Sequence, residues 1–169
     1  MDQKAFIQLV NPFKDKVYRV AKRLLISDDE AQDATQEILL KLWMQRSKFG
    51  KYRSVEAFAM TMTKNYCYDR LKAKSSSNLK IVHSNYEDHS RNTERQIDAA
   101  DEVSWVFKLM KDLPQQQQLI VQLRDIEQFN NAEIADMLKM NETAVRVALS
   151  RARKTLREGL IKKQNYGIR

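Results

Sequence analysis

Glycine and proline are scarce in this sequence, and their scarcity restricts the possible folds more than any other feature. The chain has 3 glycines and 2 prolines among 169 residues. Tight turns, β-hairpins and phosphate-binding loops depend on these residues, because few others tolerate the backbone angles that such turns require. The sequence therefore predicts an all-α protein, and it contains no Walker or Rossmann glycine fingerprint.

The formal net charge is +8, which favours polyanionic partners such as nucleic acid or an acidic protein surface over a small substrate. Cys67 is the single cysteine, so no internal disulfide can form. The apolar runs are only a few residues long, far short of the roughly 20 that cross a bilayer. We therefore expect a cytoplasmic protein that does not insert directly into a membrane.

Apolar residues spaced three and four apart predict one amphipathic helix from Phe6 to Leu24. Ser27 and Glu30 then fit a capping box, in which the serine oxygen accepts from a free amide and the glutamate reaches back to the serine N–H. A second helix is therefore expected to begin just after Ser27, near Asp28, and to continue for about five turns.

The helical pattern is interrupted between residues 47 and 54, which are rich in basic side chains, and we interpret this stretch as a basic loop. A third helix follows and ends in a basic segment at Lys74. The residues after it are mostly polar and too few are apolar to offset the entropy lost on ordering. These changes predict a helical domain at residues 1–78 and a flexible linker at residues 79–96.

A helical pattern returns at Ile97 and breaks at Pro114, which suits the first position of the next helix. Asn130 and Asn141 are each expected to cap a further helix. Two short helices joined by three residues indicate a helix-turn-helix. The sequence therefore predicts a second small helical domain at residues 97–169. Its expected core residues are Ile134, Ala135, Leu138, Val145 and Leu149.

Charge is distributed unevenly within this second domain. Residues 97–141 contain four basic and eight acidic residues, whereas residues 142–169 contain eight basic and two acidic ones. A protein that is acidic where it meets protein and basic where it meets DNA would have this pattern. The alternative is a solvated basic helix that has no partner.

Each expected domain also contains a set of residues whose types and order match the motifs of a known protein family. In the C-terminal domain they are Leu113-Pro114, Val121, Leu123-Arg124, Glu133-Ile134-Ala135, Leu138, Val145 and Leu149-Ser150-Arg151-Ala152-Arg153. In the N-terminal domain they are Asp29-Glu30-Ala31, Asp33-Ala34, Gln36-Glu37, Leu40 and Trp43, then Phe58, Asn65 and Asp69-Arg70. Together they resemble the extracytoplasmic-function group of the sigma-70 family of bacterial sigma factors. The resemblance covers residues 5 to 160 and implies a transcription initiation factor that directs core RNA polymerase to promoters and assists strand opening.

The second expected helix carries three polar residues, Asp33, Gln36 and Glu37, close together beside its apolar stripe. The resemblance implies that this region-two patch binds the clamp helices of the largest subunit of core RNA polymerase. The alternative is that the two carboxylates only solvate the helix and favour its N-terminal half through the helix dipole.

The basic loop and the helix after it can act in strand opening, because cations attract phosphates and flat rings stack on unpaired bases. The resemblance implies that such a loop captures a base flipped from the non-template strand and that Asn65, whose amide offers a donor and an acceptor, completes the pocket. Phe58 stands where the family usually has tryptophan, and Thr61 where it often has arginine. For the two loop aromatics, the alternative is packing over the core. The candidate residues are Lys48, Phe49, Lys51, Tyr52, Arg53, Asn65, Asp69, Arg70 and Lys72.

The last expected helix would be the region-four recognition helix, in which Arg146 lies near the start, where base contacts in the major groove are usually made. Val147 and Ala148 stand where the family often has a polar and a basic residue. Readout is therefore expected to depend more on Arg146, Thr143 and apolar contacts with thymine methyl groups. The candidate residues on this helix are Thr143, Arg146, Val147, Ser150, Arg151, Arg153, Lys154 and Arg157.

An enzyme is a second class to consider, but the sequence offers little for it. His83 and His89 lie with Glu87 and Asp88 in the expected linker, whereas a metal site needs a rigid frame and three or four ligands. Cys67 has no histidine nearby in sequence, so we interpret it as a partly buried thiol. We therefore expect no catalytic residues, no metal and no cofactor.

A third class is a stand-alone helix-turn-helix regulator, which would bind specific duplex DNA without any other protein. A sigma factor would instead need core polymerase to recognise a promoter. The resemblance implies three partners: core RNA polymerase, promoter DNA and an anti-sigma factor.

Overall fold

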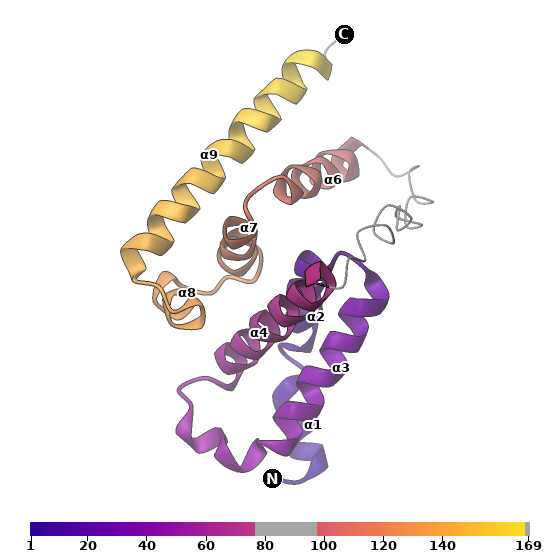
Figure 1. Ribbon diagram of the computed structural model, residues 1–169, viewed down its shortest axis with the longest axis vertical. Coiled ribbons are helices and arrows are strands. Elements are labelled where there is room, and N and C mark those ends of the chain that lie inside the picture. Colours follow the sequence, from indigo (N-terminus) through magenta and orange to yellow (C-terminus); the bar gives the residue numbers. More distant parts are fainter. Residues whose placement is uncertain (77–97, 168–169) are drawn as a thin grey trace.

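The computed structural model describes residues 1–76 and 98–167, and in this part of the chain every regular element is a helix (Figure 1). The helices form an N-terminal unit, α1 to α4, and a C-terminal unit, α6 to α9. The all-α prediction with a C-terminal helix-turn-helix is confirmed. The expected linker at 79–96, with its two histidines, lies outside the described residues.

The single helix expected from Phe6 to Leu24 is wrong, because the structure has two helices there. These are α1 (Gln3–Val10) and α2 (Lys14–Leu25). Pro12 lies between them, and proline lacks the N–H that a continuous helix needs. The Phe13 N–H closes the turn on the Val10 carbonyl at 3.0 Å. Phe13 is nevertheless buried, so the apolar spacing continues across the break and conceals it.

The next helix, α3 (Asp28–Met44), begins where its cap predicts. The Ser27 hydroxyl accepts a hydrogen bond from the Glu30 N–H at 3.4 Å. The other half of the expected capping box is absent, because the Glu30 carboxylate forms ion pairs with Lys74 and, at 3.8 Å, with Arg70. This contact ties the start of α3 to the end of α4.

The expected loop at residues 47–54 is instead mostly a 3-10 helix, η1 (Arg46–Lys51). The last helix of the unit is α4 (Val55–Ser76), and Ser54 caps it by accepting from the Ala57 N–H at 3.1 Å. Helix α2 packs against both α3 and α4, so it is the central helix of this unit.

The C-terminal unit contains α6 (Asp98–Lys111), α7 (Gln115–Val121), α8 (Asn131–Leu138) and α9 (Glu142–Gly167). Pro114 lies one residue before α7 rather than inside its first turn. The Asn130 and Asn141 side chains cap α8 and α9, accepting from backbone amides at 2.8 and 2.7 Å. Three residues join α8 to α9, so the predicted helix-turn-helix spacing is confirmed.

A π-helical turn, η3 (Gln122–Ile126), follows α7 directly. Its wider turn is closed by the Glu127 N–H, which donates to the Gln122 carbonyl at 2.9 Å. The two side chains also meet, because the Gln122 amide donates to the Glu127 carboxylate at 2.8 Å. Single π turns inside α-helices often mark functional positions.

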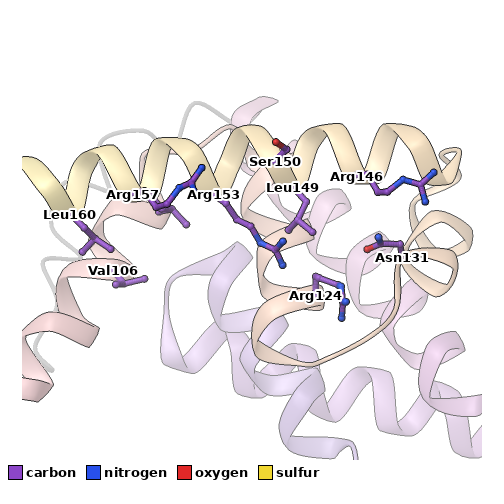
Figure 2. Close-up of a pocket in the computed structure, with 10 residues that line it drawn as sticks. Val106, Arg124, Asn131, Arg146, Leu149, Ser150, Arg153, Arg157 and Leu160 are labelled. Atoms are coloured by element: carbon purple, nitrogen blue, oxygen red, sulfur yellow. The ribbon is translucent and has the colours of Figure 1, made fainter.

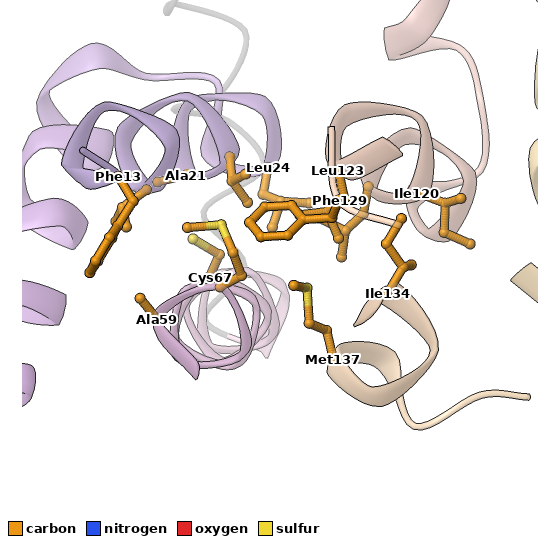
Figure 3. Close-up of a cluster of buried hydrophobic side chains, with 14 of the residues drawn as sticks. Phe13, Ala21, Leu24, Ala59, Cys67, Ile120, Leu123, Phe129, Ile134 and Met137 are labelled. Atoms are coloured by element: carbon orange, nitrogen blue, oxygen red, sulfur yellow. The ribbon is translucent and has the colours of Figure 1, made fainter. Parts of the chain in front are cut away.

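One hydrophobic core extends through both units. Figure 3 shows Phe129 and Met137 of the C-terminal unit facing Leu24 and Cys67 of the N-terminal unit. All four side chains are buried. Cys67 is wholly rather than partly buried, and burial raises the pKa of its thiol to about 12. This thiol is therefore poorly reactive.

Candidate polymerase and promoter interface

The face of α3 that was expected to bind polymerase is exposed in this structure. Asp33 and Gln36 are exposed and Glu37 is half-buried. Within the described residues neither carboxylate of this patch forms an ion pair. The patch can therefore accept a cation from a partner without first breaking a contact.

Two apolar side chains extend this patch along the same helix. Leu40 is 53% exposed and Met44 is 70% exposed. Leu40 lies three residues after Glu37, and Met44 lies four residues after Leu40, so both lie on the same side of α3 as Glu37. Exposed apolar side chains beside unpaired charges are typical of a protein-binding surface. Met44 is not among the residues predicted from the sequence, although it follows Leu40 at a spacing of four.

The two aromatic side chains of the basic segment pack against other aromatic rings rather than projecting into solvent. Phe49 is buried and its ring stacks on Phe6, with 6.4 Å between ring centroids. Tyr52 stacks on Phe58 at 4.0 Å with nearly parallel rings. The expectation that Phe49 offers a free face to bases is therefore wrong in this structure, because η1 turns its ring into the core. The basic residues Lys48, Lys51 and Arg53 are all exposed.

Helix α4 presents most of its expected promoter residues to solvent. Asn65, Asp69 and Lys72 are exposed, and Arg70 is exposed within reach of Glu30. Lys64 was not expected to matter, yet its side chain forms a hydrogen bond with the other unit. Its ammonium group donates to the Met137 carbonyl of α8 at 2.9 Å, and desolvation lowers its pKa.

The recognition helix α9 has a buried side and a basic side. Val145, Leu149, Ala152 and Leu156 are buried, and the residue after each of these is exposed. Arg146 forms an ion pair with Glu142 at 3.6 Å, one turn earlier. The remaining candidates on this helix, Thr143, Val147, Ser150, Arg151, Lys154 and Arg157, are all exposed.

Three arginines of α9 line a groove of about 730 Å³ between α9 and the preceding helices (Figure 2). These are Arg146, Arg153 and Arg157, and Arg124 of η3 lies across the groove from them. Arg153 forms an ion pair with Asp125, and this hydrogen-bonded carboxylate raises the pKa of Arg153. Arg124 is part of the family resemblance in the sequence but is not among the predicted DNA-contacting residues. Val106, Leu149, Leu156 and Leu160 also line this groove, so its arginines, rather than the groove as a whole, suit contact with a phosphate backbone.

The two units and these surfaces define a helix-turn-helix protein with a second helical domain. A family model described as sigma-70 region 2 matches residues 9–77, and one described as sigma-70 region 4 matches residues 105–156. The chain therefore belongs to the sigma-70 family, in its extracytoplasmic-function group, and is a transcription initiation factor.

Curated relatives match along nearly the whole chain. The ECF RNA polymerase sigma factor SigK of Mycobacterium tuberculosis (strain H37Rv) is 26% identical over 163 residues, which cover 94% of this chain and 87% of SigK. The ECF RNA polymerase sigma factor SigW of Bacillus subtilis (strain 168) is 22% identical over 169 residues, which cover 94% of this chain and 90% of SigW.

Two solved structures share the fold. The sigma factor RpoE of Bartonella quintana, in complex with the anti-sigma factor NepR, aligns with a TM-score of 0.75 and 20% identity over 93% of this chain and 97% of that one. CnrH, in complex with the cytosolic domain of CnrY, aligns with a TM-score of 0.70 and 20% identity over 95% and 90%. No helix in the described part of the chain is long and apolar enough to cross a membrane.

Proposed function

We propose that three surfaces of this sigma factor have separate functions. The α3 patch binds core RNA polymerase, α4 with the basic η1 segment acts on the promoter strand that is opened, and α9 reads the upstream promoter element. The observation that carries this proposal is a contrast between two surfaces. The α3 patch has unpaired carboxylates beside the exposed side chains of Leu40 and Met44, whereas arginines line the groove at α9. The former suits a protein and the latter suits DNA.

The chain supplies binding and positioning rather than catalysis, because bond formation belongs to the polymerase. Its place of action is the cytoplasm, where polymerase and promoter are. One structural neighbour, RpoE of Bartonella quintana, was solved in complex with an anti-sigma factor, and this supports an anti-sigma factor as a further partner. The N-terminal domain comprises residues 1–78 and the C-terminal domain residues 97–169 in this proposal.

The experiment that tests this function is in vitro transcription with core polymerase on a genomic DNA library, with and without the protein. We expect a limited set of new start sites that appear only when both proteins are present. A variant with Asp33→Lys and Glu37→Lys should lose them all. Specific duplex binding by the protein alone, without any effect on core polymerase, would instead identify a stand-alone regulator.

A further inference from the structure

A cavity of about 320 Å³ is lined by residues of α2, α6 and η3, away from the α3 patch and the α9 groove. Its apolar wall contains Ile26 at the end of α2, Phe107 of α6 and Ile126 of η3. None of its described lining residues is acidic, and four are basic: Arg19, Lys22, Arg23 and Lys111. Cavities of roughly 300–1,000 Å³ with apolar walls and a few polar groups commonly bind small molecules, so this one suits a compact ligand.

Two of the four cations are balanced by carboxylates and two are not. Arg19 and Lys22 each form an ion pair with a carboxylate that does not line the cavity, at 2.6 and 2.8 Å. Arg23 and Lys111 form no ion pair within the described residues. The cavity therefore has two cations available to an anion.

Arg23 has only neutral partners, although it is half-buried. Its guanidinium lies 4.6 Å from the centre of the Phe107 ring, and its Nε donates to the Gln122 amide oxygen at 3.3 Å. Burial lowers the pKa of Arg23, because its charge is removed from water without a carboxylate to compensate. An anion in the cavity would supply that compensation.

The backbone is irregular on both sides of the cavity. Ile26 has a φ of 71°, which β-branched residues rarely adopt. The Ser27 N–H donates to the Leu25 carbonyl at 2.8 Å, so Ile26 is the central residue of the rare, strained γ-turn with positive φ. The Ile26 side chain is 53% exposed, and the π turn η3 forms another part of the lining. Strained residues and π turns are both concentrated at functional sites, which agrees with a ligand here.

We propose that this cavity binds a small aromatic anion, whose rings lie against the apolar wall and whose phosphate or carboxylate group meets Arg23 and Lys111. A phosphate monoester carries about −1.5 to −2 charges at neutral pH, so it matches two unpaired cations more closely than one carboxylate does. A bare anion would leave the apolar wall in contact with water, so the ring is as necessary as the charge. The site goes beyond the three proposed surfaces and does not depend on them.

The site is tested by isothermal titration calorimetry of the full chain with four probes that separate the ring from the charge. We expect naphthyl phosphate to bind at a single site, and naphthoate to bind more weakly because it has a smaller charge. Naphthol has the ring without the charge, and inorganic phosphate has the charge without the ring. Each of these two should bind at least about tenfold more weakly than naphthyl phosphate.

The probes also decide between the two kinds of anion. Tighter binding of naphthoate than of naphthyl phosphate would support the site and assign its ligand to the aromatic carboxylates. The proposal is overturned if neither binds, or if naphthol or inorganic phosphate binds as tightly as naphthyl phosphate.

Variants of the lining locate the bound probe. Lys111→Gln removes a charge at an exposed position, and Arg23→Gln removes the buried one; each should weaken naphthyl phosphate binding about tenfold or more. Ile126→Trp fills the cavity without changing the charge and should abolish binding. Lys14→Gln is the matched control, since Lys14 is an exposed α2 residue that does not line the cavity.

Lys111→Gln decides the result even where the other two lining variants fail to fold, because its side chain is outside the core. Parent affinity in Lys111→Gln, or an equal loss in Lys14→Gln, would overturn the site. Naphthyl phosphate should also raise the thermal midpoint of the parent more than that of Lys111→Gln, because a ligand stabilises the folded state that binds it. These measurements involve neither polymerase nor DNA, so their failure and a failure of the proposed function are distinguishable.

Discussion

Helices α3 and α9 are both amphipathic and both present a charged surface, yet their charges are held differently. On α3, Asp33 and Glu37 have no ion-pair partner within the described residues. On α9, Arg146 is paired with Glu142 and Arg153 with Asp125. The α3 patch is thus an open acceptor for a protein cation, whereas two of the α9 arginines already share their donors with carboxylates.

The difference follows from what each surface must recognise. A protein partner supplies a fixed pattern of cations and apolar groups, so unpaired carboxylates beside Leu40 and Met44 can match it directly. DNA supplies the same phosphates at every sequence, and unrestrained arginines bind all of them. Carboxylate partners orient the arginines and moderate their attraction to any duplex. The comparison predicts larger losses from changes on α3 than from changes on α9.

The largest effect is expected from reversing both charges on α3. Asp33→Lys with Glu37→Lys should weaken binding to core polymerase by about 2–5 kcal/mol, because cations of the partner then face cations. The thermal midpoint should barely change, since neither side chain is paired within the described residues. A fluorescence measurement of the affinity for core enzyme checks the loss of binding. A thermal melt checks that the midpoint is unchanged.

The matched control for this double variant is Asp15→Lys with Glu158→Lys, which makes the same charge change at exposed positions on α2 and α9. It should bind core enzyme as the parent does. Equal binding by the folded α3 variant and the control would show that α3 is not the polymerase-binding helix.

On α9, we expect Arg146 to contact bases and Arg153 to contact phosphate. Arg146→Ala should reduce affinity for the upstream element by roughly 1–3 kcal/mol and relax preference at one or two positions. Arg153→Ala should weaken binding to all DNA sequences alike. It should also lower by about 1 the slope of log affinity against log salt concentration. Specificity profiling at two salt concentrations distinguishes them. A uniform loss for Arg146→Ala would assign it to the phosphate contacts.

Asn65 on α4 extends the comparison to a neutral side chain that acts only after the strands separate. Asn65→Ala should impair promoter opening by roughly 1–3 kcal/mol while binding to closed duplex is unchanged. Holoenzyme activity on a premelted bubble template, compared with duplex, locates the defect. An equal defect in forming the closed complex would instead indicate a structural role for Asn65.

Local features of this fold were predictable from the sequence, and long-range ones were not. The caps at Ser27, Asn130 and Asn141 depend on residues three positions away, so the sequence displays them directly. The Pro12 break was hidden because the apolar spacing continues across it into Phe13.

The errors at the candidate site have the same physical origin. Phe49 could be read as a base-stacking ring because nothing nearby in sequence shows that Phe6 covers it. Arg19 and Glu127 are 108 positions apart, and only tertiary packing brings them together. Composition and motif order were enough to predict the two units and their charged surfaces, but not the contact between the units.

The smallest effect is expected at Asp125, the partner of Arg153. This ion pair is partly exposed, so Asp125→Asn should change the free energy of unfolding by less than about 1 kcal/mol. Affinity for non-specific duplex should rise about two- to fivefold, because a negative charge beside the groove is lost and Arg153 no longer shares its donors. Sequence preference should stay the same. Asp136→Asn on α8 removes one negative charge at an exposed position without an α9 partner within the described residues, and it should have a smaller effect. A fall in duplex affinity for Asp125→Asn would show that orientation of Arg153 outweighs repulsion, and the carboxylates beside α9 would then strengthen its attraction to DNA rather than moderate it.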